Sequence, residues 1–136
     1  MPADPVLVEA LRTALAGRED VKLALLFGSQ ARGRPRTDSD ADVAYLGNAV
    51  DPLELAYTLS LAAHKEVDVV DLSLAGYPLK NAVLRDGLLL HQGDKGAEAR
   101  WRSHTIMELE LDRPGWERMR DAFLDRLARG DHRDHG

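Results

Sequence analysis

The residues best suited to chemistry lie in two short segments beside apolar runs. Gly28 and Ser29 directly follow the run Val21–Phe27, and Asp40 and Asp42 stand at the start of the next apolar run. A glycine at the exit of a buried strand lets the backbone approach a ligand closely. A helix that begins there points unpaired N–H groups at an anion. This turn is therefore a candidate phosphate site.

Asp40 and Asp42 form a candidate cation site. Residues two apart at the entrance to a strand project from the same side of the pleat, so both carboxylates can hold one hard cation. Magnesium takes oxygen ligands at about 2.0–2.1 Å and commonly combines one or two carboxylates with substrate phosphates. Taken alone, Gly-Ser is most often a turn and Asp-x-Asp a solvated loop. Their joint placement predicts a phosphate-binding site next to a magnesium-binding site.

A third carboxylate would complete a metal-assisted transfer site, and the segment VDVVDL offers two. Asp68 lies mid-strand, where an acid is costly unless it is paired or bound to metal. Strand alternation puts Asp68 and Asp71 on opposite faces, so at most one of them joins Asp40 and Asp42. We expect Asp68 to be the third acid, able also to accept a proton from an attacking hydroxyl. Asp71 is then an exposed strand-end residue, and an edge-strand surface position for Asp68 is the alternative.

Hydrophobic periodicity predicts the elements that must position these groups. The predicted helices cover residues 6–16, 52–65 and 77–85 and, from 97 onward, a helical stretch that Pro114 and Gly115 interrupt; the predicted strands cover 21–27, 42–46, 67–72 and 88–91. Val6 and Leu53 are among the apolar residues expected to face the core. This order predicts an α/β or α+β fold, with a small mixed sheet flanked by helices.

The composition limits the classes of protein that fit. At 136 residues the chain has room for one domain, expected over residues 1–130, followed by a polar tail over 131–136 that we expect to be disordered. A net charge of −5 argues against broad nucleic-acid binding. The chain has no cysteine, its five histidines share no metal-ligand spacing, and no apolar run approaches the roughly 18 residues of a membrane span. We therefore expect a cytoplasmic protein that makes no membrane contact.

The same residues carry a resemblance to a known family. Gly28-Ser29, ten intervening residues and then Asp40-Ala41-Asp42 resemble the Gly-Ser-x10-Asp-x-Asp signature of the polymerase-β-like nucleotidyltransferase superfamily. Within it, the segment GSQARG, the compact length and VDVVDL followed by a helix and a short strand are similar to the minimal nucleotidyltransferases (MNT), which are encoded beside HEPN-domain partners. The similarity runs from about residue 21 to residue 129.

The resemblance implies a fold, an activity and a partner. MNT antitoxins resemble enzymes that use Mg²⁺ and ATP to transfer AMP to a tyrosine hydroxyl of a cognate HEPN ribonuclease toxin, with which a hetero-oligomer is expected. The resemblance implies that Gly28 and Ser29 hold the triphosphate, that Arg32 steadies phosphate, and that magnesium is bound by Asp40, Asp42 and Asp68.

Two other functions fit the same residues. One is a nucleotidyltransferase for a small-molecule hydroxyl, such as an aminoglycoside-like antibiotic, although relatives of that type usually carry an additional substrate-binding domain. The other is an antitoxin that silences its toxin by binding alone, with the fold serving only as a scaffold. Retention of three acids together with Gly-Ser favours the enzyme.

Overall fold

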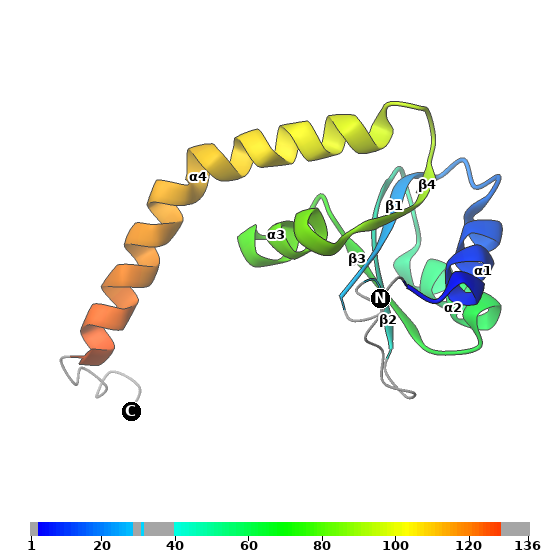
Figure 1. Ribbon diagram of the computed structural model, residues 1–136, viewed down its shortest axis with the longest axis horizontal. Helices are drawn as coiled ribbons and strands as arrows, with labels where there is room; N and C mark the ends of the chain where they lie inside the picture. Colours follow the sequence, from blue (N-terminus) through cyan, green and yellow to red (C-terminus); the bar gives the residue numbers. More distant parts are fainter. Residues whose placement is uncertain (1–2, 29–30, 32–39, 129–136) are drawn as a thin grey trace. The chain divides into compact units, whose positions relative to one another are not determined.

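Four helices and four strands make up the part of the chain that the structure, a computed structural model, describes, namely residues 3–28, 31 and 40–128 (Figure 1). Their order matches the order predicted from the sequence. The elements are α1 (Pro5–Leu15), β1 (Val21–Phe27), β2 (Ala41–Gly47), α2 (Pro52–Ala63), β3 (Val67–Asp71), α3 (Tyr77–Asp86), β4 (Leu88–Gln92) and α4 (Ala97–Ala128).

The strands form one mixed sheet in the order β3-β2-β1-β4. The central strand β1 pairs antiparallel with both β2 and β4, whereas β2 pairs parallel with β3. A parallel pair needs a crossover connection, and α2 supplies it between β2 and β3. The predicted fold class, a small mixed sheet flanked by helices, is confirmed.

Alternating side chains of the sheet supply two apolar cores, one on each face. On one face, buried residues such as Ala24, Val43 and Val67 pack with buried leucines of α1 and α2. On the other face, Leu25 and Ala44 belong to a second cluster that includes Val83 of α3 and Trp101 at the start of α4. Both faces of β1 are therefore covered, which explains why its sequence is almost uninterruptedly apolar.

Proline and aspartate set the first turns of α1 and α2. Both helices have proline at their first position, where the missing N–H costs nothing. Asp4 caps α1 by accepting from the N–H of Val6, and Asp51 caps α2 by accepting from the N–H groups of Leu53 and Glu54. The sequence therefore specifies both helix starts locally.

Two residues expected in the core are instead exposed. Val6 is 77% exposed and Leu53 is 82% exposed. In α2 the sheet is contacted by Leu55 and Leu59, which are fully buried, while Leu53 and Tyr57 lie one above the other on an exposed stripe. Because α2 carries leucines on more than one side, its sequence periodicity does not tell which side faces the sheet.

The predicted interruption at Pro114 and Gly115 is wrong. The helix α4 continues through both positions from Ala97 to Ala128. Proline inside a helix costs about 3 kcal/mol, and here strong helix formers such as Glu, Arg, Met and Leu on both sides sustain the element.

The chain divides into two compact units, residues 1–102 and 103–136, with the α/β sheet entirely in the first. The expectation of a single domain over residues 1–130 stays a prediction, and the tail over 131–136 lies outside the described residues. None of the described helices has the length and apolar character needed to cross a membrane.

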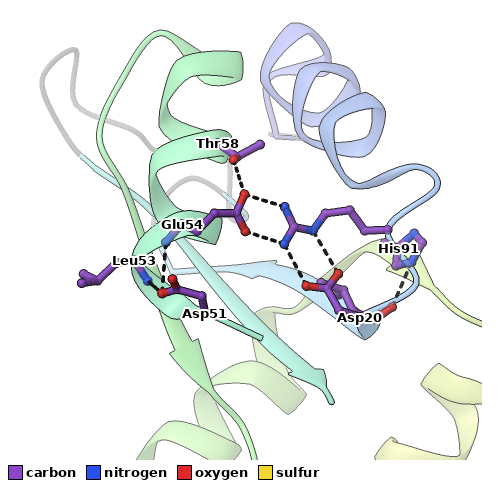
Figure 2. Close-up of polar contacts among 8 residues, drawn as sticks. Asp20, Asp51, Leu53, Glu54, Thr58 and His91 are labelled. Carbon is purple, nitrogen blue, oxygen red and sulfur yellow. Dashed lines mark hydrogen bonds and ion pairs between the residues drawn. The ribbon is translucent and has the colours of Figure 1, made fainter. Parts of the chain in front are cut away.

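An arginine network joins the loop after α1 to the crossover helix α2 (Figure 2). Arg18 donates to both carboxylate oxygens of Glu54, at 3.0 and 2.7 Å, and to both oxygens of Asp20, at 3.2 and 2.9 Å. The Thr58 hydroxyl donates to Glu54 at 2.7 Å. The Arg18 guanidinium, and then Thr58, lower the pKa of Glu54 from its usual 4.5 to about 2. This network anchors the helix that holds β3 beside β2.

We predict that the Arg18–Glu54 pair makes stability depend on pH below about 4.5. Because the pKa of Glu54 is lower in the folded chain, its stabilisation is fully present above pH 4.5 and is lost as the pH falls through about 2. The stability difference between wild type and Glu54→Gln should therefore shrink over this window. Thermal unfolding at stepped pH measures it.

Glu9→Gln is the matched control, since Glu9 is an exposed glutamate of α1 outside the Arg18 network. A wild-type advantage over Glu54→Gln that stays constant from pH 6 to pH 2 would contradict the prediction.

Candidate metal and nucleotide site

The parallel pairing of β2 with β3 sets two aspartates side by side. Asp42 is the register partner of Asp68, and Phe27 lies opposite Asp42 on the other neighbouring strand. The preceding residues, Ala41 and Val67, are buried in the core against α1 and α2. Because side chains alternate along a strand, Asp42 and Asp68 project from the opposite face of the sheet. The structure therefore brings together two of the three predicted acids by register alone.

Asp40 and Glu66 lie two residues before Asp42 and Asp68 and add two more acids to this pair. They precede Asp42 and Asp68 on the same two chain segments, and the Ala41 N–H donates to the Glu66 carbonyl oxygen at 3.1 Å. One carboxylate oxygen from each of Asp40, Glu66 and Asp68 lies within 4.8 Å of the others, and all three residues are exposed. The result is an array of four carboxylates, two on each segment.

Glu66 is the member of this array that sequence reasoning missed. It lies one residue before the predicted strand over 67–72, outside the strand segment that predicts the acid positions. A signal was present, because Glu66-Val67-Asp68 repeats the acid-x-acid spacing of Asp40-Ala41-Asp42. Two such motifs at the starts of neighbouring parallel strands come together at one edge of the sheet.

Gly28 lies directly against the array. Its φ is +79°, in the left-handed region that glycine adopts without strain. A Cβ atom placed on Gly28 would stand 3.0 Å from Oδ2 of Asp42. Because Gly28 has no side chain, the Asp42 carboxylate can lie beside it.

Two members of the array, Asp42 and Glu66, have raised pKa values. Burial, followed by the charges of Asp68 and Asp40, raises the pKa of Asp42. A hydrogen bond to Asp40, followed by the charges of Asp40 and Asp68, raises the pKa of Glu66. Within the described part of the chain, no arginine, lysine or histidine forms an ion pair with any of the four. The array thus concentrates negative charge that a cation would offset.

Asp71 lies outside the array. It is paired in register with Tyr45, a buried residue of the core against α1 and α2, and therefore faces away from Asp42. Its Oδ1 accepts from the backbone N–H and the hydroxyl of Ser73, at 2.9 and 2.7 Å, so it closes the turn after β3. Asp71 is half-buried rather than exposed. The register thus puts Asp68 and Asp71 on opposite faces, as alternation predicts, and Asp68 is itself an exposed residue of the edge strand β3.

The donor set suits a hard divalent cation. All four side chains offer carboxylate oxygens, the ligands that Mg²⁺ prefers, and the absence of a side chain on Gly28 lets the Asp42 carboxylate lie at the end of β1. Two other predicted site residues, Ser29 and Arg32, and the predicted helix start after Gly28 lie outside the described residues.

Comparison with known proteins identifies the class. Residues 9–96 match the family described as polymerase beta, nucleotidyltransferase, and the chain belongs to this family. Gly28 and all four acids fall within the matched range, so the array lies in the nucleotidyltransferase domain. The chain is accordingly a nucleotidyltransferase. No curated protein matches it.

Several solved structures are similar to most of the chain. A chain of a toxin–antitoxin complex with AMP-PNP is 28% identical with a TM-score of 0.68, covering 85% of this chain and 98% of that one. A chain of an MntA–HepT toxin–antitoxin complex is 25% identical with a TM-score of 0.64, covering 88% and 99%. A complex of tri-AMPylated Shewanella oneidensis HEPN toxin with MNT antitoxin contains a chain that is 26% identical with a TM-score of 0.59, covering 86% and 92%. The predicted resemblance to MNT proteins is confirmed.

Gly28 and Gly17 allow a test of the contact with Asp42. Both have a positive φ, +79° and +81°, but a Cβ on Gly17 would meet nothing within 4 Å. Each change to alanine should cost about 1–2 kcal/mol of unfolding free energy, the penalty of the left-handed backbone. Only Gly28→Ala should also displace Asp42 and weaken Mn²⁺–AMP-PNP binding, by about tenfold.

Urea unfolding and calorimetric titration of both variants measure these effects. Equal nucleotide affinity in Gly28→Ala and Gly17→Ala would show that the Asp42 position beside Gly28 does not matter for binding.

Proposed function

We propose that this chain is a Mg²⁺-dependent protein adenylyltransferase, an antitoxin that transfers AMP from ATP to a tyrosine hydroxyl of a cognate HEPN ribonuclease toxin. The observation that carries the proposal is the alignment of Asp42 with Asp68 across β2 and β3, directly beside Gly28. Family membership supports the transfer chemistry. The similar complexes, one with AMP-PNP and one with a tri-AMPylated HEPN toxin, support the nucleotide, the acceptor and the partner.

Each predicted site residue has a role in this proposal. Gly28 and Ser29 hold the triphosphate through the turn that leaves β1, and Arg32 steadies a phosphate. Asp40, Asp42 and Asp68 are the proposed magnesium ligands. When bound, the metal neutralises charge on the phosphates and orients them for in-line displacement.

The proposed reaction balances without a further reactant. The tyrosine oxygen attacks the α-phosphorus of ATP, the bond from that phosphorus to the oxygen bridging the β-phosphorus breaks, and pyrophosphate leaves. Asp68 accepts the phenolic proton, since it is exposed and can be reached by an incoming hydroxyl. The products are the O-AMP ester of the tyrosine and pyrophosphate, with the proton on Asp68.

A macromolecular acceptor agrees with the openness of the array. Asp40, Glu66 and Asp68 are all exposed, so within the described residues nothing encloses the side from which an acceptor would come. A protein partner can supply the missing wall around the reacting hydroxyl and exclude water. The cysteine-free composition favours the cytoplasm as the compartment.

Labelling of the purified HEPN partner tests the proposal. With ATP labelled at the α-phosphorus and Mg²⁺, wild type should label the partner, whereas ATP labelled at the γ-phosphorus should not. The double variant Asp40→Asn with Asp42→Asn should label at least about 100-fold more slowly, since it loses two charged groups that act in the transition state. Asp71→Asn, on the opposite face of β3, should label at close to the wild-type rate.

Size-exclusion chromatography of the complex with the partner separates the proposed enzyme from the two alternative functions. A double variant that binds the toxin and silences it as well as wild type does would make this a binding antitoxin. If a small hydroxyl compound is labelled and the protein partner is not, the acceptor is a small molecule rather than the HEPN toxin.

A further inference from the structure

Glu66 extends the candidate metal site beyond the three aspartates of the proposed function. Its side chain belongs to the carboxylate array, yet neither the proposed phosphate site nor the proposed magnesium ligands use it. We propose that Glu66 is a cation ligand of this site, acting together with Asp40 and Asp68. The inference rests on the proposed function, because it assigns a further residue to the same metal.

The strand register gives the first argument. Asp42 and Asp68 are partners in the parallel pairing, and Asp40 and Glu66 each stand two residues earlier. The backbone bond from Ala41 to Glu66 holds the two segments together at this step. Glu66 therefore projects from the same face as the other three acids.

The distances give the second argument. Oxygens of Asp40, Glu66 and Asp68 lie within 4.8 Å of one another. Two ligands on opposite sides of a magnesium ion are about 4.2 Å apart, twice the metal–oxygen distance of about 2.1 Å. The separations among the three oxygens, at most 4.8 Å, exceed that value by no more than about 0.6 Å. Asp42 does not belong to this group of three, and it instead lies against Gly28.

The surroundings give the third argument. None of the ion pairs formed within the described residues involves Glu66, Asp40 or Asp68. All three side chains are exposed, so a hydrated cation can reach them without displacing a packed group. The array thus has an end beside Gly28, where Asp42 lies, and an end away from it, where Glu66 lies.

Binding of Mn²⁺ to the full chain tests this assignment without relying on activity. Electron paramagnetic resonance of free Mn²⁺ gives the affinity and the number of sites, with and without AMP-PNP. Glu66→Gln should weaken Mn²⁺ binding by about tenfold or more, and Asp40→Asn should do so as well. Glu9→Gln, an exposed glutamate on α1, should bind as wild type does.

Thermal unfolding gives a second measurement. In EDTA, Glu66→Gln should melt no lower than wild type, because it removes one of four like charges. The rise in melting temperature on adding Mn²⁺ should be smaller than in wild type. If Glu66→Gln does not fold, Glu66→Asp replaces it. Its side chain is one methylene shorter, so its Mn²⁺ affinity should fall below that of wild type.

The outcomes distinguish this inference from the proposed function. Unchanged Mn²⁺ affinity in the Glu66 variants, together with loss in Asp40→Asn, would overturn the role of Glu66 and leave the proposed function standing. Absence of Mn²⁺ binding by wild type, with or without AMP-PNP, together with failure to label the partner, would overturn both.

Discussion

The site depends on one constraint, the parallel pairing of β2 with β3. This pairing sets Asp42 beside Asp68 and carries Asp40 and Glu66 into the same array. Like charges at such positions repel, so the arrangement is unfavourable in the absence of a cation. The sheet offsets this cost because the residues that alternate with the acids, Ala41 and Val67, are fully packed in the core. Packing on one face thus holds acids together on the other.

The remainder of the fold serves that pairing. Parallel strands cannot be joined by a tight turn, so α2 must cross the sheet between them. Leu55 and Leu59 seat this helix on the sheet, and the Arg18 network fixes its first turn to the loop after α1. The crossover helix therefore packs on β3 and connects it to β2, the pairing that brings the carboxylates together.

Much of the fold could be predicted from the sequence because its signals are local. The bounds predicted for β1 are those observed, since an apolar run bounded by polar residues has only one reading at that length. The choice of Asp68 over Asp71 followed from alternation, which depends only on strand regularity. The acid-x-acid spacing of Glu66-Val67-Asp68 is a local signal, but only the pairing of β3 with β2 shows that it brings Glu66 beside Asp40. The inward side of α2 and the continuity of α4 are likewise decided by packing and by the sum of many weak preferences.

The order β3-β2-β1-β4 leaves β3 at an edge of the sheet. Such a strand exposes unpaired backbone groups that can recruit another chain and begin aggregation. Here the edge is only five residues long and carries an aspartate at its second and last positions. Those charges oppose edge-to-edge pairing of β3 with a strand of another molecule. Asp68, an acid of the candidate metal site, therefore has a second consequence, because its charge also opposes polymerisation of the protein through its own sheet.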